Sequence, residues 1–131
     1  MSFTGWVERC FSRRRKAIAL YRSGIAKASK GDHGGAIADY SAAVGIPNLP
    51  NDLKAMVVYN RALAYSAIHE EERAAEDLAA VLHMPGCPAL IRTHAQQRQH
   101  RIRQIGERKS HWTAHRDDGE QLRPEANRGI S

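Results

Sequence analysis

Four histidines near the C-terminal end are the first candidates for metal chemistry. His111 and His115 are four residues apart, the spacing at which two ligands on one helix can hold zinc, and His94 and His100 are nearby in sequence. The glutamate of the zinc-protease pattern HExxH is missing between the pair, and no pair of cysteines is close. We therefore expect adventitious metal binding at most and no metal cofactor.

The other groups with chemical potential are better explained by structure. Residues 31–35 (GDHGG) could cradle a phosphate, but they lack the Lys-Ser/Thr of a P-loop and the glycine spacing of a dinucleotide motif, so a turn is expected. Cys10 and Cys87 have no ordered Cys–His–Asn/Asp set, and two cysteines are no disulfide framework. Three glutamates at 70–72 are typical of a solvated helix start. We expect that the protein is not an enzyme and has no cofactor.

The elements that carry these groups follow a repeat with an offset of 38 residues. Small residues fall on small ones, large apolar residues fall on large apolar ones, and both units end at a proline. The matched pairs are Leu20/Val58, Tyr21/Tyr59, Gly24/Ala62, Ala26/Ala64, Ala36/Ala74, Asp39/Asp77, Tyr40/Leu78, Ala42/Ala80 and Pro47/Pro85. A fixed offset of this size indicates a stacked helical repeat.

Apolar side chains at steps of three and four predict helices over about 6–30, 32–44, 51–68, 70–84 and 88–105. The first stretch fits one long helix, or a short helix over about 5–14 followed by a second from near Ala17. The second interpretation suits the repeat better. Gly31 is expected to close that helix and Asp32 to cap the next, and Gly106 is expected to end the last one.

Two sets of key positions carry a resemblance to a known family. They are Leu20, Ser23, Gly24, Lys27, Ala36, Tyr40 and Pro47 in the first unit, and Val58, Arg61, Ala62, Tyr65, Ala74, Leu78 and Pro85 in the second. Over residues 17–85 these spacings resemble the tetratricopeptide repeat (TPR) family. The twelve-residue step between the small residues of each unit matches the family, where it places them at the crossing of two helices.

The chain departs from the TPR pattern in four ways. Leu20 and Val58 replace the family's Trp, and Ser23 and Arg61 replace its Leu. Each proline comes one residue early, and the period is 38 residues instead of 34. The extra four residues fall in the loop 48–51.

The resemblance implies an all-α fold: an α-solenoid of two TPR-like helical hairpins with an N-terminal helical segment, a polar C-terminal capping helix and a disordered tail. The expected divisions are 1–16 for the basic N-terminal segment, 17–106 for the repeat domain with its capping helix, and 107–131 for the polar tail. The tail has almost no apolar periodicity, which is typical of disorder.

The function that the resemblance implies is that of an adaptor or scaffold, with a peptide or partner helix bound in a groove lined by the first helix of each hairpin. The expected groove residues are Ile18, Tyr21, Ile25, Ala28, Met56, Tyr59, Asn60, Leu63 and Ser66. One TPR subgroup grips chaperone C-termini with Lys and Asn. Only Asn60 matches that clamp, since Tyr21 and Ile25 occupy two of its positions, so an apolar partner segment is expected instead.

Charge suggests an alternative function. The net charge is +6, and an acidic middle lies between two basic ends. The basic run Arg13, Arg14, Arg15 and Lys16, flanked by Trp6 and Phe11, could contact nucleic acid or an anionic membrane surface. A solvated basic face, with the aromatic residues covering the open end of the stack, is the preferred interpretation.

The expected cellular setting follows from composition. The N-terminus is Arg-rich and acid-poor, like a mitochondrial transit peptide, but the repeat begins within it and no secretory segment is present. Reduced cysteines fit a cytoplasmic protein. Two repeats are fewer than the three usually needed to bury a continuous core, and the terminal helices or a second copy can compensate, so we expect a monomer or weak homodimer. No stacking aromatics lie among the arginines of residues 88–106, so tight nucleic acid binding is not expected.

Overall fold

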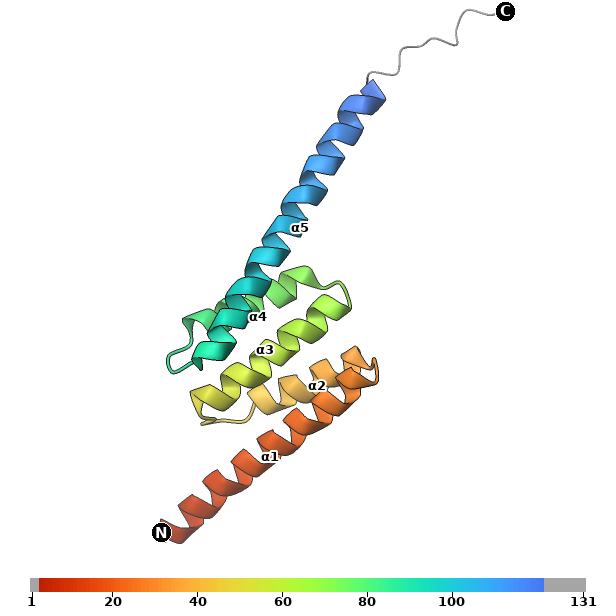
Figure 1. Ribbon diagram of the computed structural model, residues 1–131. Helices are drawn as coiled ribbons and strands as arrows, with labels where there is room; N and C mark the ends of the chain where they lie inside the picture. Colours follow the sequence, from red (N-terminus) through yellow and green to blue (C-terminus); the bar gives the residue numbers. More distant parts are fainter. Residues whose placement is uncertain (1–2, 122–131) are drawn as a thin grey trace, which may run out of the picture. The chain divides into compact units, whose positions relative to one another are not determined.

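The computed structural model describes residues 3–121, and these residues form helices and connecting loops without a strand (Figure 1). The helices are α1 (Phe3–Ser29), α2 (His33–Val44), α3 (Asn51–Ala67), α4 (Glu71–His83) and α5 (Ala89–Gln121). The expected all-α class is confirmed. The chain divides into two units, Met1–Gln99 and His100–Ser131, so the first turns of α5 belong to the first unit.

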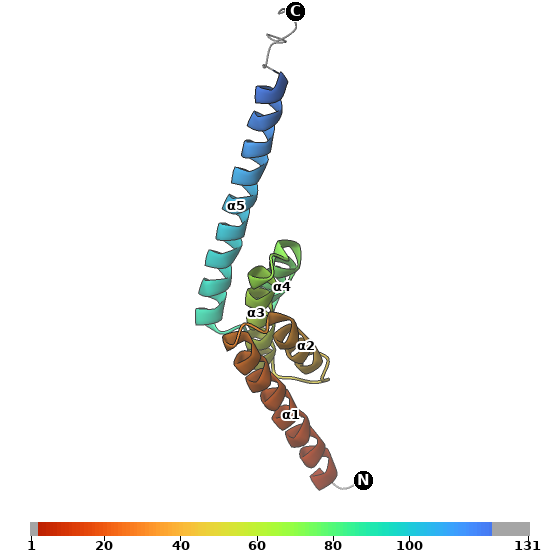
Figure 2. The same ribbon diagram turned by 90° about the vertical axis from the view of Figure 1, so that its right-hand side faces the viewer.

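In the first unit, the first four helices pack in chain order, each against its neighbour among the four. Helix α1 packs on α2, α2 on α3 and α3 on α4, as the two views in Figures 1 and 2 show. We call α1 with α2 the first hairpin and α3 with α4 the second hairpin. Short loops join the helices, so neighbouring helices run in opposite directions.

Alanine dominates the core, which allows close helix approach. The large side chains that are fully buried are Tyr40, Val57, Leu78 and Val81. They pack among buried small residues, namely Ala17, Ala36, Ala43, Ala55, Ala62, Ala64, Ala74 and Ala95. Alanine loses no side-chain entropy on burial, so a core built largely from alanine has a low entropic cost even with few large side chains.

The two helices of the first hairpin approach each other closely at Gly24. A Cβ atom at this position would lie 2.7 Å from Cδ1 of Tyr40 and closer still to Cε1 of the same ring. The Tyr40 ring is fully buried and has little room to move. At the matched positions, the second hairpin carries Ala62 and Leu78, which are both buried. A larger residue on one helix is thus matched by a smaller one on the other.

The turn between α1 and α2 has the expected chemistry. Gly31 has a φ of +85°, a conformation that glycine adopts without strain, and it closes α1. The Asp32 side chain accepts a hydrogen bond from the Gly35 backbone N–H at 2.9 Å and caps α2. Both sequence predictions are confirmed.

Helix α1 is one continuous helix, so the preferred prediction of a separate helix before Ala17 is wrong. The basic run lies inside α1, and arginine and lysine are good helix formers. No proline or glycine interrupts the chain between Phe11 and Ala17. Without a helix-breaking residue, the helix continues through the basic run, whose charged side chains lie in solvent.

Helix α5 does not end at Gly106, as its sequence predicted, but continues to Gln121. A glycine in a helix interior costs about 1 kcal/mol relative to alanine, which weakens a helix without ending it. The residues around it include arginine, glutamine, glutamate and lysine, which favour helix. A helix therefore occupies residues 107–121 of the expected disordered tail, and the remainder of that tail lies outside the described residues.

Candidate binding surfaces

The expected groove residues lie on α1 and α3 and are half-buried, except Ile25, which is 41% exposed. Two of them, Tyr21 on α1 and Asn60 on α3, form a contact between the two helices. Asn60 donates one hydrogen bond from Nδ2 to the Tyr21 hydroxyl at 3.2 Å and another to the Met56 carbonyl at 2.8 Å. Burial raises the pKa of the Tyr21 hydroxyl above its ordinary value. Tyr21 is therefore held between helices.

Tyr59, which matches Tyr21 in the repeat, contacts helix α5. Its ring centroid lies 6.3 Å from that of His94, in the first turns of α5 and within the first unit. Ser66 donates a hydrogen bond to a Glu71 carboxylate oxygen at 3.4 Å, and Ala28 packs against the buried core. Among these contacts, no such role falls to the apolar side chains of Ile18, Ile25, Met56 and Leu63.

Polar pairs inside each hairpin were not predicted from the sequence. In the first hairpin, Ser23 Oγ donates to Asp39 Oδ2 at 2.6 Å, and Lys27 Nζ lies 3.0 Å from the same oxygen. The hydrogen bond from Ser23, followed by Lys27, holds the pKa of the Asp39 carboxyl below its usual value. This pair joins α1 to α2 near the hairpin crossing.

The matched positions of the second hairpin carry an ion pair. Arg61 donates two hydrogen bonds to the Asp77 carboxylate, from Nε at 2.8 Å and from Nη2 at 2.7 Å. Its Nη1 donates to Ser41 Oγ at 3.2 Å, which ties α3 to α2 as well. Asp77 raises the pKa of the Arg61 guanidinium. The signal in the sequence was the pair of departures from the TPR leucine, Ser23 and Arg61, opposite aspartates that match in the repeat.

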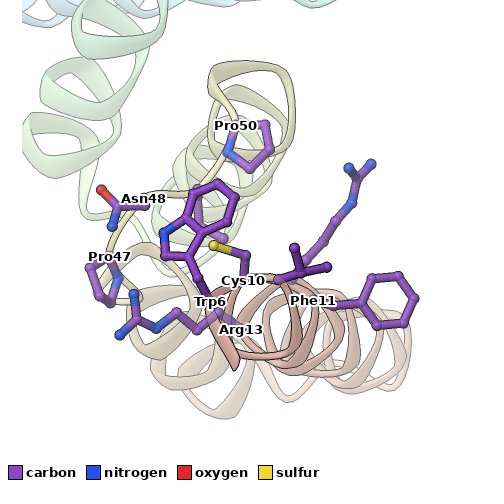
Figure 3. A pocket seen from close by; sticks show the side chains of 10 residues that line it. Trp6, Cys10, Phe11, Arg13, Pro47, Asn48 and Pro50 are labelled. Atoms are coloured by element: carbon purple, nitrogen blue, oxygen red, sulfur yellow. The ribbon is translucent and has the colours of Figure 1, made fainter. Parts of the chain in front are cut away.

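The N-terminal part of α1 (residues 3–16) forms a pocket with the loop between α2 and α3 (Figure 3). The pocket has a volume of about 290 Å³. Its lining residues are Trp6, Val7, Cys10, Phe11, Arg13 and Arg14 from α1, and Pro47, Asn48, Leu49 and Pro50 from the loop. Trp6 and Cys10 point toward the loop, whereas the Phe11 ring points away from it.

The aromatic side chains of this pocket are exposed, at 60% for Trp6 and 56% for Phe11. The Arg15 guanidinium lies 4.4 Å from the centre of the Phe11 ring, at cation–π distance. The sequence predicted that Trp6 and Phe11 would cover the open end of the stack. Both side chains instead remain more than half exposed beside the basic run.

The histidines offer no metal site in the part of the chain that the structure describes. His111 and His115 lie on one face of α5, with ring centroids 4.4 Å apart. Within residues 3–121, no group of three His, Cys, Asp or Glu side chains could hold a metal ion. None of the helices in these residues combines the length and the apolar composition of a membrane-spanning segment.

Comparison of the chain with protein-family models, curated proteins and solved structures finds no match in any of the three. The resemblance to the TPR family therefore depends on the residues of this chain alone. The same is true of any function assigned to its surfaces.

Proposed function

We propose that the chain is a protein-interaction module, an adaptor or scaffold built as a TPR-like stack of two hairpins, which binds a peptide or partner helix along α1 and α3. The observation that carries this proposal is the exposure of Ile25. It is a large apolar side chain one helical turn after Tyr21, which Asn60 of α3 contacts, and Leu63 is half-buried on the expected groove face of α3. An exposed apolar residue beside half-buried ones is the kind of surface that an apolar segment covers on binding.

Matched burial in the two hairpins supports the TPR-like stack. Ala36 and Ala74 are fully buried, and so are Tyr40 and Leu78. Each pair occupies the same position of the 38-residue repeat. Two segments with the same positions buried pack their helices in the same way, which is the basis of a helical repeat.

The contacts of Asn60 favour an apolar partner over a carboxylate. Both hydrogen bonds that its amide group can donate are used, one to Tyr21 and one to the Met56 backbone. The one residue that matches the carboxylate clamp is therefore occupied within the protein. A segment that presents apolar side chains fits this face better than a free C-terminal carboxylate.

Structural roles also account for the groups that could have served catalysis, and this supports a binding function. Asp32 caps α2, Cys87 is buried, and Asp77 is paired with Arg61. A catalytic group needs access to substrate. Asp77 and Cys87 are buried, and the carboxylate of Asp32 is used by its cap.

The test is a selection of binding peptides from a displayed random library on the immobilised full chain. Peptides that bind along α1 and α3 should lose about tenfold or more in affinity on Ile25→Glu, because the change places a charge in the apolar contact. Ile68→Glu is the matched control, since Ile68 is 42% exposed at the C-terminal end of α3 and is not an expected groove residue. If no selected peptide distinguishes the two variants, this surface is not the binding site.

A further inference from the structure

The N-terminal part of α1 extends beyond the helices that cover its C-terminal part. Helix α1 has 27 residues and α2 has 12, which correspond to roughly 40 Å and 18 Å at 1.5 Å per residue. The first buried residue of α1 is Ala17. Residues 3–16 therefore form just over half of the helix, and the loop 47–50 lies against them at the pocket.

Apolar residues continue along one side of this segment. Phe3, Val7 and Cys10 are spaced by four and three residues, and the same spacing leads on to Ala17 and Tyr21, which pack in the unit. Trp6 lies beside them and points to the loop. This apolar stripe is covered by other helices in the C-terminal half of α1 and is exposed in the N-terminal half. An exposed apolar stripe of this kind is typical of a surface that binds a partner.

The charge around this stripe has one sign. Residues 3–16 include five basic side chains and a single acid, Glu8, and all six are exposed. Two of the basic residues, Arg13 and Arg14, line the pocket itself. Arginine pairs with carboxylates through two parallel hydrogen bonds, so the rim of the pocket is built to receive acidic groups.

We infer that residues 3–16 of α1, with the loop 47–50, form a second docking site, which takes an acidic peptide segment with one large apolar anchor. The anchor enters the pocket beside Trp6 and Cys10, and its flanking carboxylates pair with Arg13 and Arg14. This site is separate from the proposed groove, because its lining residues precede Ala17 or lie in the loop before α3.

The geometry favours a peptide over a membrane surface. The pocket is concave, with the loop as one wall, and Trp6 and Phe11 point in different directions, so a flat bilayer cannot cover both (Figure 3). Arg14 follows Val7 by seven residues and Cys10 by four, which places it within the apolar stripe. A carboxylate of a peptide can neutralise this charge, whereas hydrocarbon cannot.

The geometry also disfavours a second copy of the chain on this surface. In a symmetric dimer, the same patch meets itself across the two-fold axis. The pairing would bring the arginines of both copies together, and like charges at an interface are destabilising. An acidic segment gives the charge complementarity that a second basic patch lacks.

The experiment uses the full chain with Trp112→Phe, which leaves Trp6 as the only tryptophan. Peptides selected from a displayed random library are titrated, and Trp6 fluorescence should shift to the blue as the anchor covers the indole. The sequences that cause this shift should share a Leu or aromatic residue flanked by Asp or Glu. Trp6→Ala, followed by anisotropy of the labelled peptide, should weaken them about tenfold or more.

Charge reversal distinguishes the contribution of the pocket arginines to peptide affinity from the contribution of basic residues elsewhere on α1. Arg13→Glu/Arg14→Glu should weaken the same peptides about tenfold, with a loss of salt dependence. Arg22→Glu is the matched control, because Arg22 is exposed on the same helix outside the pocket and should leave affinity unchanged. Circular dichroism confirms that each variant folds.

Three results would overturn the inference. The first is that the selected peptides lack acidic residues. The second is that none of them loses affinity on Trp6→Ala. The third is that Arg22→Glu weakens binding as much as Arg13→Glu/Arg14→Glu does. If no acidic peptide needs Trp6, two further results would assign the surface to another partner. A blue shift with vesicles of phosphatidylcholine and phosphatidylserine would assign it to a membrane, and binding of a labelled oligonucleotide would assign it to nucleic acid. Ile25→Glu should leave this site unchanged, so failure here is distinguishable from failure of the proposed groove.

Discussion

The two hairpins place different chemistry at the same two positions. At the position where the TPR pattern has leucine, the first hairpin has Ser23 and the second has Arg61, and each bonds an aspartate 16 residues later. The first contact is a short hydrogen bond supported by a half-exposed lysine, whereas the second is a bidentate ion pair that also reaches α2. The comparison shows that a helix crossing can be joined by polar groups of different strength without a change in register.

The neighbouring positions differ in volume rather than in charge. The first hairpin combines a glycine with a buried tyrosine, and the second combines an alanine with a buried leucine. In each case, the smaller residue on one helix makes room for the larger one on the other. These positions are therefore coupled, and a change at one should be judged with its partner.

Removal of the carboxylate should affect the second hairpin far more than the first. Asp77→Ala leaves the Arg61 guanidinium partly buried without its partner, and we expect a loss of about 3 kcal/mol in the free energy of unfolding. Asp39→Ala removes a pair with a lysine that is 42% exposed, so its loss should be about 1 kcal/mol or less. Urea denaturation of both variants measures the difference. Equal losses would show that the two contacts are energetically equivalent.

The volume pairs can be exchanged between the hairpins. Gly24→Ala forces a Cβ atom into the Tyr40 ring and should lower the free energy of unfolding by about 1–3 kcal/mol, despite the higher helix propensity of alanine. Tyr40→Leu should relieve this clash, because the double variant carries the pair found in the second hairpin. We expect the double variant to lose less than the sum of the two single changes, by about 1 kcal/mol or more. Strictly additive losses in thermal or urea denaturation would contradict the coupling.

The sequence predicted the features that depend on local spacing. Helix positions and the roles of Gly31 and Asp32 follow from periodicity and turn chemistry within a few residues. The ends of the long helices were not predicted in the same way. The basic run in α1 and Gly106 in α5 contain weak signals for a boundary, but only a strong breaker or a packed turn ends a helix.

Contacts between distant residues were beyond what periodicity can show. The pocket near Trp6 needs a loop some 40 residues further along the chain as its second wall, and the pattern of α1 alone contains no sign of it. The Tyr21–Asn60 hydrogen bond likewise joins two residues on separate helices. Both tyrosines of the repeat were expected in a groove, and the structure places them against neighbouring helices. Which side chains of an apolar face remain free depends on this packing.

The smallest expected effect is a dependence of the first hairpin on pH. The pKa of Asp39 is lowered in the folded state from an ordinary value of 3.8, so the folded protein binds this proton less tightly than the unfolded chain does. The stabilisation is therefore complete above about pH 5 and is lost as the pH falls through 3.8 toward the lower folded value. Asp39→Asn removes the titrating group, and the difference in unfolding free energy between wild type and this variant should shrink from about pH 5 to pH 3. Other carboxyl groups titrate in both proteins and cancel in the difference. A difference that stays constant over this range would mean that the Ser23 and Lys27 contacts do not favour the ionised carboxylate, and the first hairpin would then be held by the apolar packing around Tyr40.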